Sequence, residues 1–409
     1  MSDVATASKS RFSTLYSRKA QALPDAPRMA GTKGTPPRIS FIYGFPDAAS
    51  LPGQQVAEAT ARAMEHSADK ALQYGGVQGV PALIDELLTK LRTDQKIEAG
   101  PENVIITSGA SQAVELILEA LLDRGDIVLA EQPTWSGFNV GVNNMGGVVV
   151  PIAMDDQGTD VDQLEAELVR YRDAGTPAKF IYVIPNFQNP TGVTMTVARR
   201  ERIVELAEQF DTLIMEDDAY FDLRYEGDFL PTIYSLDTNH RTIYLGTFSK
   251  IMGAGMRLGW AIAPAELITK LSILKMEGGS GIFASYVAAE WVPKHLSEHI
   301  AELRTIYRQR RDIMLAALER HMPAGASWTR PEGGFFVWVT LPEGLNTSEL
   351  APMARERGVD FLPGAACFAD GGGQNTLRLS FSFATDQQIP EGIEILGQIF
   401  SDELREQGR

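Results

Sequence analysis

The middle of the chain alternates short apolar segments with segments of helical periodicity, and this alternation restricts the possible folds more than any other feature. The apolar segments are rich in β-branched residues and predict strands, whereas the segments between them repeat apolar residues at helical spacing. Strands are expected at 103–107, 127–130, 148–152, 180–184, 212–215, 242–245 and 258–263, and helices at 110–123, 160–172 and 196–210. This order indicates βαβ units and a mostly parallel sheet with helices on both faces.

The pattern changes after Pro293, which predicts a second, smaller α+β domain. Its expected elements are a long helix at 294–321, a segment at 333–341, a helix at 347–357, a strand at 376–382 and a terminal helix from Gln388. The fold class is therefore α/β, with a large domain on a mostly parallel sheet of about seven strands. We expect an N-terminal segment at 1–50 associated with the small domain, a large domain at 51–293 and a small domain at 294–409.

Charge and composition exclude several classes of function. The formal net charge is -16, and such an acidic surface repels nucleic acid and anionic membranes. No stretch approaches the roughly 18 apolar residues of a membrane span, and Met1–Arg18 lacks the apolar stretch of a secretory signal. The single cysteine, Cys367, allows no internal disulfide and no cysteine metal site. We therefore expect a cytoplasmic protein without a membrane or nucleic-acid partner.

Polar residues stand at the carboxyl ends of three predicted strands, where open α/β sheets bind ligands. Thr107–Gln112 can hold an anion at a helix N-terminus or serve as an ordinary helix cap. Asn186–Gly192 can place the Asn189 amide in the crevice or form a turn without a ligand. Glu216–Tyr220 begins with three adjacent carboxylates, which are costly after an apolar strand unless a positive group faces them. A metal ion is one such group, but no histidine lies nearby, and we expect none.

The segment Gly246–Trp260 brings two hydroxyl groups, a lysine and an arginine together after another predicted strand. One interpretation is a glycine-rich loop with a solvated lysine, Lys250. The glycines at 253 and 255 do not form a dinucleotide-binding loop, because they follow the lysine rather than a strand and a third glycine is misplaced. A phosphate-binding loop of the Walker type is also absent from the sequence.

Taken in order, these motifs resemble the fold-type I pyridoxal 5'-phosphate enzymes, and among them the class I and II aminotransferases. The resemblance covers nearly the whole chain and is closest to the aminoadipate and aromatic aminotransferase branch. The motifs are Tyr74-Gly75, Ser108-Gly109-Ala110-Ser111-Gln112, Glu131-Gln132-Pro133-Thr134-Trp135, Asn189-Pro190-Thr191-Gly192, Asp217-Asp218-Ala219-Tyr220, Ser249-Lys250 with Arg257, and Leu377-Arg378-Leu379-Ser380. Each motif alone is weak, but together and in this order they are specific.

The resemblance implies a cofactor, pyridoxal 5'-phosphate (PLP), held as an imine on Lys250. Asp217 is expected to keep the pyridine nitrogen protonated, and Tyr220 and Asn189 are expected to donate hydrogen bonds to the ring 3'-oxygen. Lys250, once displaced by the substrate, would move the proton between the substrate Cα and the cofactor C4'. Lys250, Asp217 and Tyr220 are therefore the expected catalytic residues.

The resemblance also implies the remaining cofactor contacts. The phosphate is expected to be surrounded by Ala110, Ser111, Gln112, Thr247, Ser249 and Arg257. Trp135 would stack on the ring face, where this branch more often has tyrosine. Tyr74 would reach the phosphate of the neighbouring subunit's cofactor, which implies a homodimer with shared active sites.

For the substrate, the resemblance implies that Arg378 grips the α-carboxylate at two points. Asn189 is expected at the same site, and the backbone around Gly44 is expected to close over the carboxylate.

The identity of the substrate side chain is less well defined by the sequence. An aromatic or large aliphatic donor is indicated by the expected pocket rim of Tyr43, Phe45, Trp135 and Phe283. A dicarboxylic substrate needs a further cation, for which Arg11, Arg18 and Arg28 are candidates; each can equally be a solvated surface residue.

These inferences favour an aminotransferase that uses an α-amino acid and a 2-oxo acid, with 2-oxoglutarate as the expected acceptor. Another PLP reaction on the same scaffold, such as β-elimination, decarboxylation or oxidation, is the alternative, because a fold does not fix the reaction. A DNA-binding regulator that carries this fold is a third class. The acidic charge and the short segment of about 50 residues before the large domain disfavour it.

Overall fold

An eight-stranded sheet forms the centre of the larger part of the molecule in the computed structural model, which describes residues 14–17, 20–21, 37–277 and 279–408. The strand order is β2 (Val104–Thr107), β9 (Gly259–Ile262), β8 (Thr242–Thr247), β7 (Leu213–Asp217), β6 (Phe180–Val183), β3 (Ile127–Gln132), β4 (Val148–Asp155) and β5 (Gly158–Thr159). Pairing is parallel from β8 to β4 and antiparallel at β9 and β5. The predicted mostly parallel sheet is confirmed, with the two-residue β5 as an additional edge strand.

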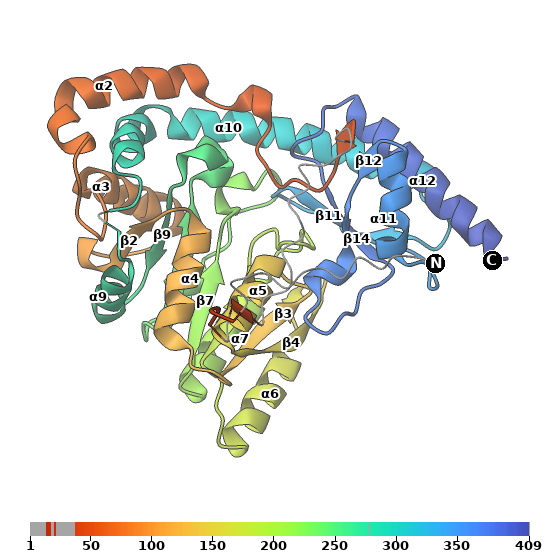
Figure 1. Ribbon diagram of the computed structural model, residues 1–409, viewed down its shortest axis with the longest axis horizontal. Coiled ribbons are helices and arrows are strands. Elements are labelled where there is room, and N and C mark those ends of the chain that lie inside the picture. Colours follow the sequence, from red (N-terminus) through yellow and green to blue (C-terminus); the bar gives the residue numbers. More distant parts are fainter. Residues whose placement is uncertain (1–13, 18–19, 22–36, 278, 409) are drawn as a thin grey trace.

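Helices cover both faces of this sheet (Figure 1). One face packs against α4 (Ala110–Leu121), α5 (Ser136–Met145) and α9 (Ala265–Leu274), and the other against α6 (Val161–Asp173), α7 (Val197–Gln209) and α8 (Ile233–Leu236). Successive strand residues point to opposite faces, so Tyr182 joins the first apolar cluster and Ile181 joins the second. Strands buried on both faces are apolar throughout, which explains why the sequence identified them.

A four-stranded antiparallel sheet forms the centre of the smaller part of the molecule. Its order is β10 (Ser327–Trp328), β11 (Phe336–Thr340), β14 (Thr376–Ser380) and β13 (Leu362–Pro363), accompanied by α11 (Thr347–Glu356) and α12 (Gln388–Glu406). A separate parallel pair joins β1 (Ile39–Ser40) to β12 (Val359–Asp360), so these residues of the N-terminal segment lie against the C-terminal part of the chain. The predicted smaller α+β part is confirmed.

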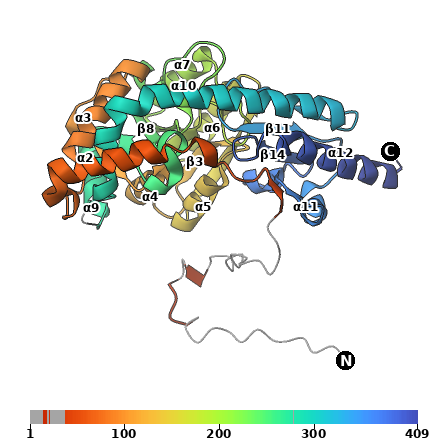
Figure 2. The same ribbon diagram turned by 90° about the horizontal axis from the view of Figure 1, so that it is seen from above.

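The helix α10 (Ile282–His321) connects the two parts and packs against α2 (Gly53–Ala71), α3 (Pro81–Lys90) and α12 (Figure 2). The predicted helix start at residue 294 was wrong, because α10 continues through Pro293. A proline inside a helix costs about 3 kcal/mol, but Trp291 and Leu296 are buried on either side of it and their packing holds the helix together. A domain boundary at 293 would divide this continuous helix, and the division into domains stays a prediction.

Five helices, α2, α3, α5, α8 and α9, were not predicted from the sequence. For α5 the reason is local, because its sequence is rich in Gly and Asn, which are poor helix formers. Apart from the start of α10, the elements that were predicted begin and end within a few residues of the predicted positions, and the short strands β1, β5, β10, β12 and β13 were not predicted. Within the described part of the chain, no helix combines the length and the apolar character needed to cross a bilayer.

Candidate active site

The strands β2, β3, β6, β7 and β8 end at the same edge of the large sheet, and a cavity of about 240 Å³ lies there. Ligands bind at this position in open α/β sheets. The lining residues are Phe45, Gly109, Ala110, Ser111, Trp135, Ile184, Asn189, Asp217, Ala219, Tyr220, Thr247, Ser249, Lys250, Ala254 and Arg257. Most of the residues expected at a cofactor site from the sequence are therefore in one cavity, which we call the catalytic pocket.

Lys250 follows β8 in a short turn and places its amine in the catalytic pocket. Its Nζ donates to the Gly44 carbonyl oxygen at 3.0 Å and lies 5.8 Å from the centre of the Tyr220 ring. Burial, together with the positive charge of Arg378, lowers the pKa of Lys250 to about 8, against the opposing effect of Asp217. A lowered pKa provides the neutral amine that a nucleophile needs.

Asp217, the last residue of β7, is buried and has one unsatisfied oxygen. Its Oδ2 accepts a hydrogen bond of 2.8 Å from the Tyr182 hydroxyl, whereas Oδ1 has no hydrogen-bond partner. Burial raises the pKa of Asp217, while Tyr182, the Ala219 N–H and Lys250 act in the opposite direction. Buried carboxylate oxygens are normally satisfied, so this atom indicates that a donor belongs in the pocket.

The two neighbouring carboxylates are satisfied elsewhere. Glu216 accepts from the backbone N–H groups of Ile233 and Tyr234, and Asp218 accepts from the Asn186 amide at 2.8 Å and the Tyr244 hydroxyl at 3.3 Å. Burial raises the pKa of Glu216 to about 8 and that of Asp218 to about 6.

The positive group expected near these carboxylates is the fully buried Arg200, whose charge opposes both of these pKa shifts. Among the residues that the structure describes, no cluster of His, Cys, Asp and Glu could hold a metal ion.

The start of α4 has the features of a site that could hold an anion. Ala110 and Ser111 are the first residues of α4, whose N-terminal N–H groups face the catalytic pocket at the positive end of the helix. Gly109 has φ +75°, a backbone conformation that favours glycine, and a Cβ there would lie 2.8 Å from Arg257 Nη2. Arg257 is held in place by donating from Nη2 to the Ser108 carbonyl oxygen at 2.7 Å.

Thr247 and Ser249 line the same pocket, and their hydroxyls are hydrogen-bonded to each other at 2.9 Å. The arrangement fits a phosphate group bound by helix N–H groups, hydroxyls and a guanidinium.

Trp135, Asn189 and Tyr220 form the other walls of the pocket. A Cβ on Gly137 would lie 2.3 Å from the Trp135 ring, so the glycine leaves the space that the indole occupies. Tyr220 is buried, and its ring packs in a T-shaped arrangement against the rings of Phe335 and Phe336. Burial raises the pKa of its hydroxyl.

Arg378 and Gly44 lie directly beside the catalytic pocket. Arg378 donates from Nη1 to Asn189 Oδ1 at 2.8 Å and from Nη2 to the Ile42 carbonyl oxygen at 2.5 Å, and its Nε has no partner. Its guanidinium lies 4.1 Å from the centre of the Phe336 ring. A Cβ on Gly44 would lie 2.7 Å from the same ring, so only a residue without a side chain allows this close approach.

Some expected site residues do not line the catalytic pocket. The Gln112 amide accepts from the Ser108 N–H at 2.7 Å and donates to Glu277 at 3.2 Å, so it holds the backbone just before α4 instead of lining the pocket. Tyr74 is 86% exposed, and Phe283 is 43% exposed. The candidate cations Arg11, Arg18 and Arg28 lie outside the described residues.

Sequence reasoning missed one residue in contact with the site. Tyr182 lies in an apolar strand and carries the hydroxyl that fixes Asp217. The signal was a tyrosine in the fully buried β6, since a buried hydroxyl needs a partner.

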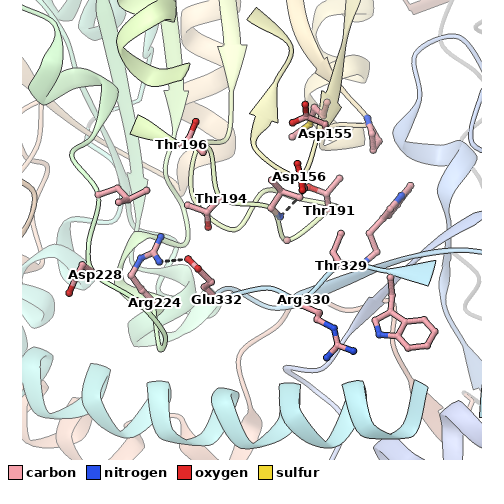
Figure 3. A pocket seen from close by; sticks show the side chains of 18 residues that line it. Asp155, Asp156, Thr191, Thr194, Thr196, Arg224, Asp228, Thr329, Arg330 and Glu332 are labelled. Carbon is pink, nitrogen blue, oxygen red and sulfur yellow. Dashed lines mark hydrogen bonds and ion pairs between the residues drawn. The ribbon is translucent and has the colours of Figure 1, made fainter. Parts of the chain in front are cut away.

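A second cavity of about 890 Å³ lies between the two parts of the molecule (Figure 3). It is larger than the catalytic pocket and shares no lining residue with it. Some of its charged side chains form ion pairs, Arg224 with Glu332 at 2.5 Å and Asp155 with Arg199 at 2.5 Å, and its four carboxylates, those of Asp155, Asp156, Asp228 and Glu332, are exposed. None of the described residues that line it is a lysine, and we therefore place the chemistry in the smaller pocket.

Known proteins resemble this chain over most of its length. The family described as "Aminotransferase class I and II" matches residues 43–396. The aromatic-amino-acid aminotransferase 1 of Thermococcus litoralis is 39% identical over 370 residues, which is 90% of this chain and 89% of that protein.

Two solved structures are also similar. The kynurenine aminotransferase of Pyrococcus horikoshii, solved with PMP, superimposes with a TM-score of 0.92 at 37% identity over 97% of this chain and 99% of that one. The α-aminoadipate aminotransferase of Thermus thermophilus, complexed with N-(5'-phosphopyridoxyl)-L-leucine, gives a TM-score of 0.88 at 32% identity over 96% of this chain and 99% of that one.

Proposed function

Because this chain belongs to the class I and II aminotransferase family, we propose that it transfers the amino group of an aromatic, large aliphatic or aminoadipate-like α-amino acid to 2-oxoglutarate. The chain is a PLP-dependent aminotransferase, of the type that acts on aromatic amino acids, aminoadipate and kynurenine. The choice of donor and acceptor, and the role of each residue, are the parts that we propose.

One observation carries the proposal. The catalytic pocket combines a lysine amine, with its pKa lowered to about 8, and a buried carboxylate oxygen without a partner, Asp217 Oδ1. The amine suits covalent attachment of an aldehyde, and the carboxylate suits a cationic N–H donor such as a protonated pyridine. The helix N-terminus at Ala110 with the Arg257 guanidinium suits a phosphate. The residues present therefore fit PLP.

When bound, PLP supplies an electron-withdrawing ring that takes up the electron pair left at the substrate Cα. Lys250 would attach the cofactor through Nζ and, once displaced by the substrate amine, move the Cα proton as a general base. Asp217 would hold a proton on the ring nitrogen, and Tyr182 keeps this carboxylate in place by its hydrogen bond. Tyr220 and Asn189 would donate to the ring oxygen, and Trp135 would cover one ring face.

The substrate carboxylate would be bound by Arg378. Its Nε is buried and has no partner, while Asn189 and the Ile42 carbonyl oxygen orient the other two nitrogens. Gly44, whose carbonyl oxygen accepts from Lys250, would close over the same carboxylate. Since burial lowers the pKa of this arginine, an anion beside it would offset the cost of the buried charge.

The preference for an aromatic or large apolar donor is supported by a group of rings at the pocket mouth. Tyr43 and Phe45 are stacked with their centres 4.9 Å apart, and Phe383 packs edge-on against both. All three rings are more than a third exposed, and Phe45 lines the catalytic pocket. An apolar substrate side chain would cover this surface.

We also propose a homodimer with shared active sites. Leu72, Tyr74, Ile273 and Met276 expose apolar side chains at fractions of 71%, 86%, 70% and 96%. Leu72 and Tyr74 follow the end of α2, and Ile273 and Met276 lie at the end of α9, where Lys275 joins the two segments by donating to the Val77 carbonyl oxygen at 2.6 Å. A contiguous exposed apolar surface is typical of a protein interface.

For location we propose the cytoplasm, because the single cysteine gives the chain no internal disulfide for an oxidising compartment. Cell fractionation tests this.

A half-reaction assay tests the proposed reaction. Purified holoenzyme is mixed with phenylalanine, tyrosine, leucine, aminoadipate or kynurenine without an acceptor, and the cofactor absorbance is followed. We expect conversion to the amine form of the cofactor, recovery on adding 2-oxoglutarate, and one glutamate formed per cofactor. Release of ammonia, carbon dioxide or hydrogen peroxide without recovery would mean that a lyase, decarboxylase or oxidase reaction is the true activity.

A further inference from the structure

Gln188 is fully buried next to Asn189, and its side chain uses all of its hydrogen-bonding capacity. The Nε2 donates to the Pro133 carbonyl oxygen at 2.8 Å and to Glu131 Oε2 at 3.3 Å. The Oε1 accepts from both the N–H and the hydroxyl of Thr191, at 2.9 and 2.8 Å. A primary amide has two donor hydrogens and two acceptor positions, so each is occupied here.

Through these bonds Gln188 fixes two loops relative to each other. Asn189 follows it in one loop, and Pro133 and then Trp135 stand in the other. The backbone of Gln188 closes its own loop, donating to the Val193 carbonyl oxygen at 2.9 Å and accepting from the Gly192 N–H at 2.6 Å. A displacement of Gln188 would therefore move Asn189, which is the partner of Arg378.

The same loops form the wall between the two cavities. Asn189 and Trp135 line the catalytic pocket, whereas Pro133, Thr191 and Gly192 line the larger cavity. Figure 3 shows Thr191 among the side chains that line the larger cavity. With open space on one side, the wall depends on its own internal hydrogen bonds for its position.

Glu131 anchors this arrangement from the end of β3. It is 2% exposed and accepts hydrogen bonds from the Ile184 N–H at 3.0 Å, from the Thr159 hydroxyl at 2.9 Å and from Gln188. Among the described residues no Lys, Arg or His forms an ion pair with it. Burial raises its pKa to about 7, and the nearby charge of Asp217 acts in the same direction.

A buried carboxylate without a cation lowers stability, so stability alone does not explain its presence. The remaining groups near Glu131 are Tyr182, whose pKa it raises, and Arg200, whose charge it stabilises. Neither neutralises the carboxylate by direct contact, and its hydrogen bonds are what hold it in the wall.

We propose that Gln188, anchored on Glu131, is a positioning residue that holds Asn189 against Arg378 and so sets the grip on the substrate carboxylate. The proposal rests on the assignment of Arg378 under the proposed function, and it adds two residues for the same reaction. Neither residue touches the substrate, so their effect should appear mainly in substrate binding.

The test uses holoenzyme and compares Gln188→Met with the matched control Gln95→Met. Gln95 is also a buried glutamine, but it donates to Tyr244 away from the pocket. For Gln188→Met we expect kcat/KM for amino acids to fall by roughly 10²-fold, mainly through KM. An amine lacking the α-carboxylate should lose much less. Gln95→Met should lower Tm by about as much as Gln188→Met does, but it should leave KM unchanged.

Glu131→Gln provides the second arm, because the neutral amide removes the buried charge and weakens the hydrogen bond from Gln188, which is stronger when its acceptor is a carboxylate. Because the pKa of Glu131 is raised in the folded protein, the free energy of unfolding of the native enzyme decreases as the pH rises from 4.5 to about 7. Above that range we expect the variant to have a Tm equal to or higher than that of the native enzyme, yet a severalfold higher KM. A residue that served only stability would not produce this opposite pair of effects.

Calorimetry with 3-phenylpropionate, a carboxylate probe, separates the possible failures. If Arg378→Lys leaves probe binding unchanged, the assignment of the carboxylate site is wrong. If Arg378→Lys weakens binding but Gln188→Met stays within about threefold of native, only the positioning role is overturned. Equal losses for the amino acid and the carboxylate-free amine would also overturn it.

Discussion

The two cavities on either side of the 188–193 loop differ in how their charged groups are balanced. In the larger cavity each ion pair has an exposed carboxylate, Glu332 with Arg224 and Asp155 with Arg199. In the catalytic pocket Lys250 and Asp217 are both buried, and Asp217 Oδ1 has no partner. The two cavities therefore differ in their carboxylates, which are exposed in the larger cavity and buried with one unpaired oxygen in the catalytic pocket, and cavity size is a poor guide to the reactive groups.

The largest effect that would sharpen this contrast is expected for Lys250→Ala. Removing the amine removes both the covalent attachment and the proton carrier. The loss of the proton carrier alone should lower turnover by about 10²–10⁴-fold. The anion site at Ala110, Ser111 and Arg257 is untouched, so the variant should still bind PLP. Steady-state kinetics and equilibrium dialysis check both statements, and a variant with more than a tenth of native turnover would contradict them.

The next effect separates two adjacent carboxylates. Asp217→Asn should lower kcat by about 10²–10³-fold, because an amide cannot hold a positive charge on the ring nitrogen. Asp218→Asn should be milder, since Asp218 is satisfied by Asn186 and Tyr244 outside the pocket. Pre-steady-state measurement of Cα proton transfer checks the difference. Equal losses would mean that the unpartnered oxygen of Asp217 does not mark the cofactor.

A smaller loss is expected for Arg378→Lys, which keeps the charge but removes the two-point grip on a carboxylate. We expect kcat/KM for each amino donor to fall by an amount that corresponds to about 2–4 kcal/mol of activation free energy. The affinity for PLP should change little. The comparison substrate is an amine without an α-carboxylate, which should lose nothing. Arg378 would be a structural residue if that amine suffered equally or if PLP binding collapsed.

The smallest effect is expected in the larger cavity. Arg330→Gln removes an exposed guanidinium that lines it and that forms an ion pair with Glu319 at 3.4 Å. Exposed ion pairs contribute about 0–1 kcal/mol, so Tm and kcat/KM should both stay close to native. A loss of activity approaching that of Arg378→Lys would show that the larger cavity takes part in the reaction. The distinction between the larger cavity and the catalytic pocket would then be wrong.

Much of the fold was predictable because the central strands are buried on both faces. Segments such as 180–184 and 242–245 are uniformly apolar, and only a strand buried between two helical layers needs that composition. The start of α10 was not predictable in the same way. Its continuation through Pro293 depends on the burial of Trp291 and Leu296, which is a tertiary effect that local sequence rules do not contain.

The site was predictable for residues within recognisable motifs and less so for the residues that support them. Lys250 and Asp217 stand at strand ends in those motifs and lie in one pocket. Gln112 belongs to a motif, yet its amide bonds to Ser108 and Glu277 instead of lining the pocket. Tyr182 has no motif at all, because a strand tyrosine becomes informative only when its hydroxyl partner is known.

Identification of the lysine that carries the cofactor tests the central claim most directly. Lys275 is the sharpest competitor, because burial also lowers its pKa to about 8. Its Nζ, however, is occupied by the Val77 and Ile106 carbonyl oxygens, outside the catalytic pocket. Native holoenzyme is reduced with borohydride, digested and mapped by mass spectrometry. We expect the phosphopyridoxyl group on Lys250, whereas a label on Lys275 or Lys179 would contradict the assignment of the active site.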